Sequence, residues 1–72
     1  MEFVKAIYPT NRFVYIDGDK GGKTNDVLRV AAGTHEFDLG PLKNYEPESQ
    51  KAEVSGTTVL QPMEIVFSKK DN

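Results

Sequence analysis

The sequence predicts an all-β protein, a small antiparallel β-sandwich. Apolar and polar residues alternate with a period of two in several short segments, as in a sheet with one face on a core and the other in water. Glycine and proline separate these segments at short intervals, and no window keeps a helical period. This spacing predicts about six to seven short strands in one domain, residues 1–72.

Four strands are expected in the first half of the chain. Residues 3–8 are a mixed apolar run that ends at a turn, and residues 12–17 are rich in β-branched and aromatic side chains. After a glycine-rich turn, alternating apolar residues mark a third strand at 28–30. A fourth strand is expected at 36–39, where Phe and Leu alternate with acidic residues.

The second half is expected to contain two main strands. Residues 45–47 are a loop or a brief edge strand, because proline cannot donate to a ladder. Residues 49–54 alternate again, and residues 58–67 form a long last strand in which Pro62 forces a bulge or an edge position. The residues predicted to face a single core are Val14, Ile16, Leu28, Val30, Phe37, Leu39, Val54 and Ile65.

The composition of the chain limits which kinds of partner it is expected to bind and where it is expected to be located. The net charge of −2 argues against nucleic-acid binding, and the chain has no cysteine for a disulfide or for thiol chemistry. No apolar run approaches the roughly 20 residues that span a bilayer, so no membrane insertion is expected. The chain is expected to be cytoplasmic if Met1 is the native start, and extracytoplasmic if it belongs to a longer exported protein.

A Gly-Gly-Lys-Thr sequence at residues 21–24 resembles part of a phosphate-binding loop. The full motif, Gly-x-x-x-x-Gly-Lys-Thr, would place its first glycine at position 17, where this chain has Asp17. The loop must also open a helix, whereas residues 25–30 are rich in β-formers. We therefore interpret the glycine-rich stretch as a hairpin turn, with Lys23 exposed, and expect no nucleotide binding.

The same stretch partly resembles a calcium-binding loop. Residues 17–22 place carboxylates at the first and third positions and glycine at the sixth, but Gly21 stands at the fifth and Leu28 at the twelfth. The simpler interpretation is a turn in which aspartates bond to the neighbouring backbone. A divalent-cation site at residues 17–26 is the alternative.

No catalytic, cofactor-binding or metal-binding residue is assigned from the sequence. His35 is the only histidine and no nucleophile can be placed beside it, so we expect a structural role, such as a hydrogen bond to a turn. Tyr8, Tyr15 and Tyr45 are expected to pack with their hydroxyls at the rim. The chain is therefore not expected to be an enzyme, and no cofactor is expected.

Four short motifs occur in a recognisable order. They are residues 9–18 (Pro-Thr-Asn-Arg-Phe-Val-Tyr-Ile-Asp-Gly), 22–24 (Gly-Lys-Thr), 32–35 (Ala-Gly-Thr-His) and 44–47 (Asn-Tyr-Glu-Pro). In order and spacing they resemble the PEGA domain family, and the resemblance covers residues 9–60. It implies a small sandwich of the transthyretin-like or carboxypeptidase-regulatory-like kind. It also implies a non-catalytic module of bacterial surface, periplasmic or lipoprotein chains.

The chain departs from that family's pattern at several positions. Only Pro9 remains of the tetrapeptide that names the family, and Asn25 stands where proline follows Gly-Lys-Thr. Asp26 replaces an inward apolar residue, and Asn44 replaces a glycine, which is tolerable because asparagine also adopts positive φ.

We therefore expect a non-catalytic protein-interaction or architectural module of a bacterial cell-envelope or surface protein. The alternative is a ligand-binding module for cell-wall glycan or for a divalent cation. The expected partners are other protein chains or other domains of a longer polypeptide, bound through an exposed edge of residues 3–8 or 58–67. If these two strands instead pair with each other, the loops at 17–25 and 43–48 remain for contact.

Overall fold

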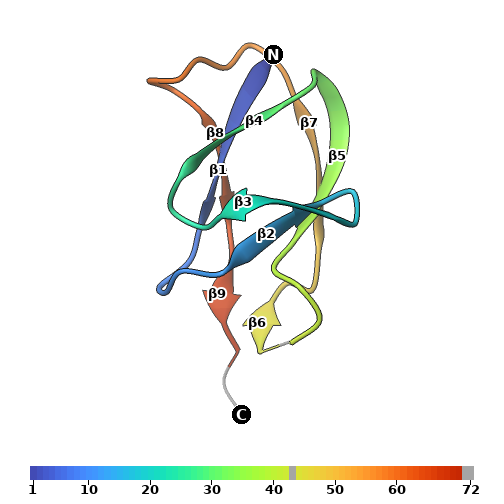
Figure 1. Ribbon diagram of the computed structural model, residues 1–72, viewed down its shortest axis with the longest axis vertical. Helices are drawn as coiled ribbons and strands as arrows, with labels where there is room; N and C mark the ends of the chain where they lie inside the picture. Colours follow the sequence, from blue (N-terminus) through green and yellow to red (C-terminus); the bar gives the residue numbers. More distant parts are fainter. Residues whose placement is uncertain (43, 71–72) are drawn as a thin grey trace.

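The computed structural model describes residues 1–42 and 44–70, and these form nine short strands and no helix (Figure 1). The strands are β1 (Glu2–Ile7), β2 (Phe13–Ile16), β3 (Asp19–Lys23), β4 (Val27–Val30), β5 (Gly33–Asp38), β6 (Tyr45–Glu46), β7 (Gln50–Val54), β8 (Met63–Val66) and β9 (Ser68–Lys69). The predicted all-β class is confirmed. The strands outnumber the prediction because β6 and β9 have two residues each and because the glycine-rich stretch is itself a strand.

Two larger sheets enclose one core. One sheet has the order β4-β1-β8 and the other the order β3-β2-β5-β7, while β6 and β9 form a small ladder at the end of the long axis opposite the start of β1 (Figure 1). Buried side chains from both larger sheets belong to a single apolar cluster, so the sheets pack face to face as a sandwich. All of the predicted core residues are buried except Ile16, which is half-buried and packs against the cluster.

The prediction that residues 3–8 form an edge strand is wrong. β1 is the central strand of its sheet, antiparallel to β4 (Phe3 opposite Arg29) and parallel to β8 (Ala6 opposite Ile65). The alternative, that the two terminal strands pair with each other, is confirmed. A parallel pair has no hairpin turn to announce it in the sequence, which is why local patterns did not favour this pairing.

The last strand is shorter than predicted. The chain from 55 to 62 is a loop, and β8 begins at Met63, directly after Pro62. Within the loop, Thr58 and Gln61 exchange both backbone hydrogen bonds, with N to O distances of 3.2 and 3.1 Å. The proline therefore marks the start of an edge strand and not a bulge inside a long one.

The glycine-rich stretch, predicted as a turn, is mostly the strand β3. The turn itself is Asp17 and Gly18, whose φ angles of 53° and 87° suit a two-residue hairpin connection. The glycines within β3 allow a close approach to the core: a Cβ on Gly22 would lie 2.3 Å from Leu28 Cδ2. Glycine inside a strand is thus required here by packing. Of the predicted contact loop at 43–48, residue 43 lies outside the described residues, and Tyr45–Glu46 is the brief strand β6.

Candidate functional site

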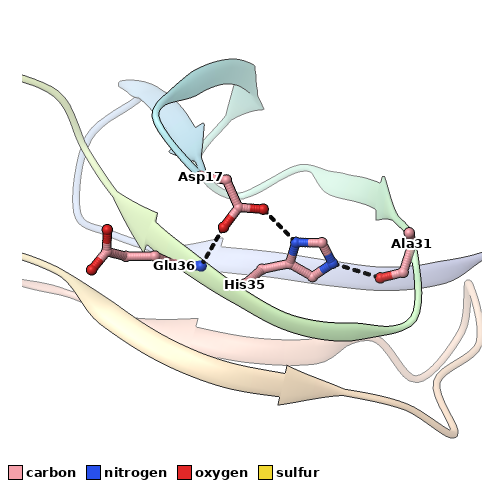
Figure 2. A network of polar contacts seen from close by, with 4 residues as sticks. All are labelled: Asp17, Ala31, His35 and Glu36. Atoms are coloured by element: carbon pink, nitrogen blue, oxygen red, sulfur yellow. Dashed lines mark hydrogen bonds and ion pairs between the residues drawn. The ribbon is translucent and has the colours of Figure 1, made fainter.

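His35, the only histidine, lies in β5 and points into a small polar cluster (Figure 2). Its Nδ1 atom lies 2.6 Å from Asp17 Oδ2, and its Nε2 atom lies 2.7 Å from the carbonyl oxygen of Ala31. The ring also meets the Phe37 ring edge-on at a centroid distance of 6.3 Å. The predicted structural contact between His35 and a turn is confirmed, because Asp17 belongs to the β2–β3 turn.

Asp17 reaches His35 because it extends the ladder between β2 and β5. Its backbone N–H donates to the carbonyl oxygen of Glu36 at 2.8 Å, and its Oδ1 atom accepts from the N–H of Glu36 at 2.9 Å. The carboxylate thus takes the place that a backbone carbonyl would have in a regular ladder. Aspartate suits this position, because it tolerates a positive φ and its short side chain bonds readily to nearby backbone.

These contacts shift the pKa values of both His35 and Asp17, each toward the charged form of the side chain. The hydrogen bond to Asp17, followed by the bond to the Ala31 carbonyl, raises the pKa of His35 above its ordinary value. The hydrogen bond from His35, followed by the N–H of Glu36, holds the pKa of Asp17 below its ordinary value. Each shift favours the charged form of its group, as expected for a carboxylate and an imidazole in direct contact.

The cluster is not arranged as a general base. Both imidazole nitrogens contact acceptor oxygens of the protein, so neither faces a substrate position. Across residues 1–42 and 44–70 the surface carries no pocket that would hold a small molecule. In the described part of the chain, this geometry suits a contact that holds the β2–β3 turn in place.

Three oxygen-bearing side chains within the proposed cation site at residues 17–26 are directed to other partners. Asp17 is engaged as described, and Asn25 bonds to the backbone of Tyr8 in both directions: Tyr8 N–H donates to Oδ1 at 3.3 Å, and Nδ2 donates to Tyr8 O at 2.9 Å. Thr24, of the Gly-Lys-Thr sequence, is buried and donates to the carbonyl of Thr10 at 2.8 Å. No group of three or more acidic, histidine or cysteine residues gathers anywhere in the described part.

A second polar cluster, centred on Arg12, was not predicted. Its guanidinium carbon lies 4.8 Å from the centroid of the Tyr45 ring and 5.7 Å from that of the Tyr8 ring. Contrary to the prediction of a hydroxyl at the rim, Tyr45 is 0% exposed, and its hydroxyl donates to the Gly40 carbonyl at 2.8 Å. Tyr8 is buried as well, whereas Tyr15 is half-buried with its ring against Gly40.

The guanidinium also fastens the connection between β5 and β6. Its Nη2 atom donates to the carbonyl oxygens of Leu39 at 3.0 Å and Leu42 at 2.9 Å, and its Nη1 atom donates to Asn44 Oδ1. The alternating pattern around Arg12 contained no signal for this role, because the groups that it binds are mostly backbone carbonyls far along the chain.

An exposed apolar turn lies in the loop between β7 and β8. Within the turn of residues 58–61, Val59 is 58% exposed and Leu60 is 90% exposed. The preceding residue, Thr57, is tied to β1: its N–H and hydroxyl donate to Glu2 Oε1 at 2.9 and 2.6 Å, and its oxygen accepts from Phe3 N–H at 2.7 Å. The loop is therefore held at its base while its apolar residues face water.

A further exposed aromatic residue lies on the outer face of the β2–β3 hairpin. Phe13 is 45% exposed, and the ammonium nitrogens of Lys20 and Lys23 lie 4.1 and 5.6 Å from its ring centroid. Both lysines belong to β3, an edge strand, where lysine side chains commonly limit pairing with other strands.

Comparison with known proteins gave no matching family model, no matching curated protein and no matching solved structure. Within the described residues there is no helix that could cross a membrane. What the protein does is therefore inferred from its own residues.

Proposed function

We propose that this protein is a non-catalytic β-sandwich module that binds other protein chains or domains. The observation that carries the proposal is the turn of residues 58–61, which holds Val59 and Leu60 in water on an anchored loop. Burying one leucine side chain against a partner is worth about 1.5–3 kcal/mol. A turn that is already ordered avoids much of the entropy loss that a flexible loop would suffer on binding.

The polar side chains support the non-catalytic part of this proposal. His35, Arg12 and Asn25 direct their side-chain bonds mostly to backbone groups, and otherwise to one side chain each for His35 (Asp17) and Arg12 (Asn44). Each joins a turn to a strand or to another connection. Such bonds make the sandwich rigid, which suits an architectural or interaction domain.

The resemblance of residues 9–60 to the PEGA domain family supports a narrower form of the proposal, in which the module belongs to a bacterial cell-envelope or surface protein. Fractionation of the source cells, followed by immunodetection of this chain, tests that form. We expect recovery with the envelope or surface fraction. Recovery in the soluble cytosolic fraction alone would contradict the location without touching the binding proposal.

A site-specific photocrosslinker tests the binding surface. We would place it at Leu60 and, as a matched control, at Leu42, which is also largely exposed (66%) and lies in the β5–β6 connection at the other end of the long axis (Figure 1). After irradiation in the source cells, we expect one predominant protein adduct from position 60 and none from position 42. Equal adducts at both positions, or none at position 60, would overturn the proposed surface.

A further inference from the structure

We propose that His35 is held as the imidazolium cation and that its deprotonation opens a clasp between the β2–β3 turn, the start of β5 and the β4–β5 connection. The proposal is independent of the partner-binding surface. It rests on the hydrogen-bonding character of the two groups that the imidazole nitrogens face, Asp17 and the Ala31 carbonyl (Figure 2).

Both groups are acceptors, and this decides the protonation state. A carbonyl oxygen has no proton to give, and a carboxylate is acceptor-only. A neutral imidazole has one N–H and one lone pair, so one of the two contacts, at 2.6 or 2.7 Å, would set a lone pair against an oxygen. Only the imidazolium donates to both oxygens at once.

The single alternative that satisfies both contacts places the proton on Asp17, whose Oδ2–H would then donate to Nδ1. The proton count of the cluster is the same in that arrangement. Carboxylic acids ordinarily lose their proton near pH 4 and imidazolium ions near pH 6.5, so the proton resides on His35. The Glu36 N–H that donates to Oδ1 further favours the ionised carboxylate.

The charged group that acts on the imidazole is Asp17. Glu36 alternates with His35 along β5, so its side chain lies on the opposite face of the sheet. On the neighbouring strand β7, Ala52 lies opposite His35, while Lys51 and Glu53 occupy the alternate positions. The pKa of His35 is raised, with Asp17 as both its main hydrogen-bond cause and its electrostatic cause.

Loss of the proton has a local consequence. The imidazole keeps one of its two hydrogen bonds, and either the Asp17 turn or the Ala31 connection is released from it. The backbone bonds between Asp17 and Glu36 remain, so the sandwich persists while two neighbouring connections loosen. Folding accordingly takes up a proton from solvent whenever the pH lies between the midpoints of the unfolded and the folded chain.

Nitrogen-15 NMR of the imidazole ring tests the proposal directly. In a titration from about pH 5 to about pH 9, which spans the ordinary imidazole value of about 6.5, we expect both ring nitrogens to report N–H up to a midpoint above that value. Hydrogen exchange at residues 17–18, at residues 31–32 or at both, according to which connection is released, is expected to accelerate beyond its intrinsic pH dependence with the same midpoint. A neutral tautomer at pH 6, or a midpoint at or below the ordinary value, would overturn the proposal.

Two variants and a control distinguish a pH-dependent role of His35 from a structural role that does not depend on its protonation. Asp17→Asn keeps an oxygen for the Glu36 N–H but removes the charge, so the midpoint of His35 should fall toward or below its ordinary value. His35→Gln should fold and lose the pH step in exchange at whichever of residues 17–18 and 31–32 shows it. Glu36→Gln, a change of a neighbouring carboxylate on the other face, should leave the midpoint in place. A midpoint unchanged in Asp17→Asn, or an exchange step that survives in His35→Gln, would contradict the clasp.

Discussion

The two ends of this sandwich differ in how far their main apolar side chains are exposed to water. At one end, which we call the closed end, Arg12 and Tyr45 seal the connection between β5 and β6. At the other, the open end, the turn of residues 58–61 leaves Val59 and Leu60 in water. Both ends are held by hydrogen bonds, but only the closed end also buries a cluster of aromatic rings, those of Tyr8, Tyr45 and Phe67.

This difference indicates that the closed end contributes mainly to the stability of the fold and the open end mainly to partner binding. The closed end surrounds Tyr45 with two further aromatic rings: the Tyr8 and Phe67 centroids lie 6.5 and 5.7 Å from its own, both edge-on. Such packing stabilises the fold and keeps all three rings buried, while Leu42 of the same connection is 66% exposed. The anchored turn of the open end contributes little burial, and its apolar side chains are available to a partner.

The largest effect is expected from Tyr45→Ala at the closed end. Removal of a fully buried aromatic ring leaves a cavity, and we expect a loss of about 3–5 kcal/mol in the free energy of unfolding. Tyr45→Phe keeps the ring but strands the buried Leu39 N–H and Gly40 carbonyl, with an expected loss of about 1–3 kcal/mol. Urea denaturation measures both. A loss below about 1 kcal/mol for Tyr45→Ala would show that the closed end is not a stabilising element.

Arg12→Ala should have the next largest effect. The guanidinium donates to two backbone carbonyls and an amide oxygen, and bonds of this charged kind are each worth about 1.5–3 kcal/mol at most. Because the side chain is partly exposed, we expect a total loss of about 1–3 kcal/mol in urea denaturation. Arg29→Ala, an exposed arginine on β4, is the matched control and should stay within about 0.5 kcal/mol. Equal losses of unfolding free energy in Arg12→Ala and Arg29→Ala would show that the Arg12 contacts do not stabilise the closed end.

The pH dependence of stability sharpens the comparison further. Hydrogen bonds from Thr57 lower the pKa of Glu2 at the open end, as those from His35 and Glu36 lower the pKa of Asp17. These contributions are present above the ordinary carboxyl values, 4.5 and 3.8, and are lost as the pH falls through the lowered ones. The raised pKa of His35 gives a contribution that is complete below 6.5 and is lost as the pH rises through the folded-state value.

We therefore expect the free energy of unfolding to be greatest between these two limits, in the mildly acidic range. Thermal denaturation followed by circular dichroism at a series of pH values measures it. Glu2→Gln should remove part of the acid slope and His35→Gln the alkaline slope. A stability that does not fall as the pH rises above 6.5 would contradict the His35 assignment, and one that does not fall as the pH drops below 3.8 would contradict the carboxylate assignments.

The smallest effect on stability is expected at Leu60. A side chain that is 90% exposed loses almost no burial in Leu60→Ser, so the free energy of unfolding should change by less than about 0.5 kcal/mol. Partner capture should nevertheless fall, because the apolar contact is gone. Differential scanning calorimetry measures the stability of Leu60→Ser, and the crosslinking assay measures its partner capture. A large loss of stability would place Leu60 in the core and end its role as a contact residue.

The sequence predicted those parts of the fold that depend on short-range alternation. Val14, Phe37 and Val54 could be assigned to the core because a strand with one buried face imposes its period on consecutive residues. The contact of His35 with a turn was also predictable, because the residue follows a turn and has no catalytic neighbour.

The remaining features depend on residues far apart in the chain. The parallel pairing of β1 with β8 has no local signal, and neither does the reach of Arg12 across to Leu39 and Leu42. The Tyr45 hydroxyl found its partners inside the protein because the β5–β6 connection folds back over it. Period and turn chemistry cannot reveal such contacts, which arise only when the sheets close on each other.

The parallel pair of β1 and β8 determines how the domain responds to tension. The two strands run side by side along the long axis, with the start of β1 near one end of that axis and β9 near the other (Figure 1). A force that pulls the ends apart draws β1 and β8 past each other, so their cross-strand bonds carry the load together and do not unzip one at a time. The two-residue ladder of β6 and β9 lies outside this pair and would yield first. We therefore expect the domain to resist stretching along its long axis.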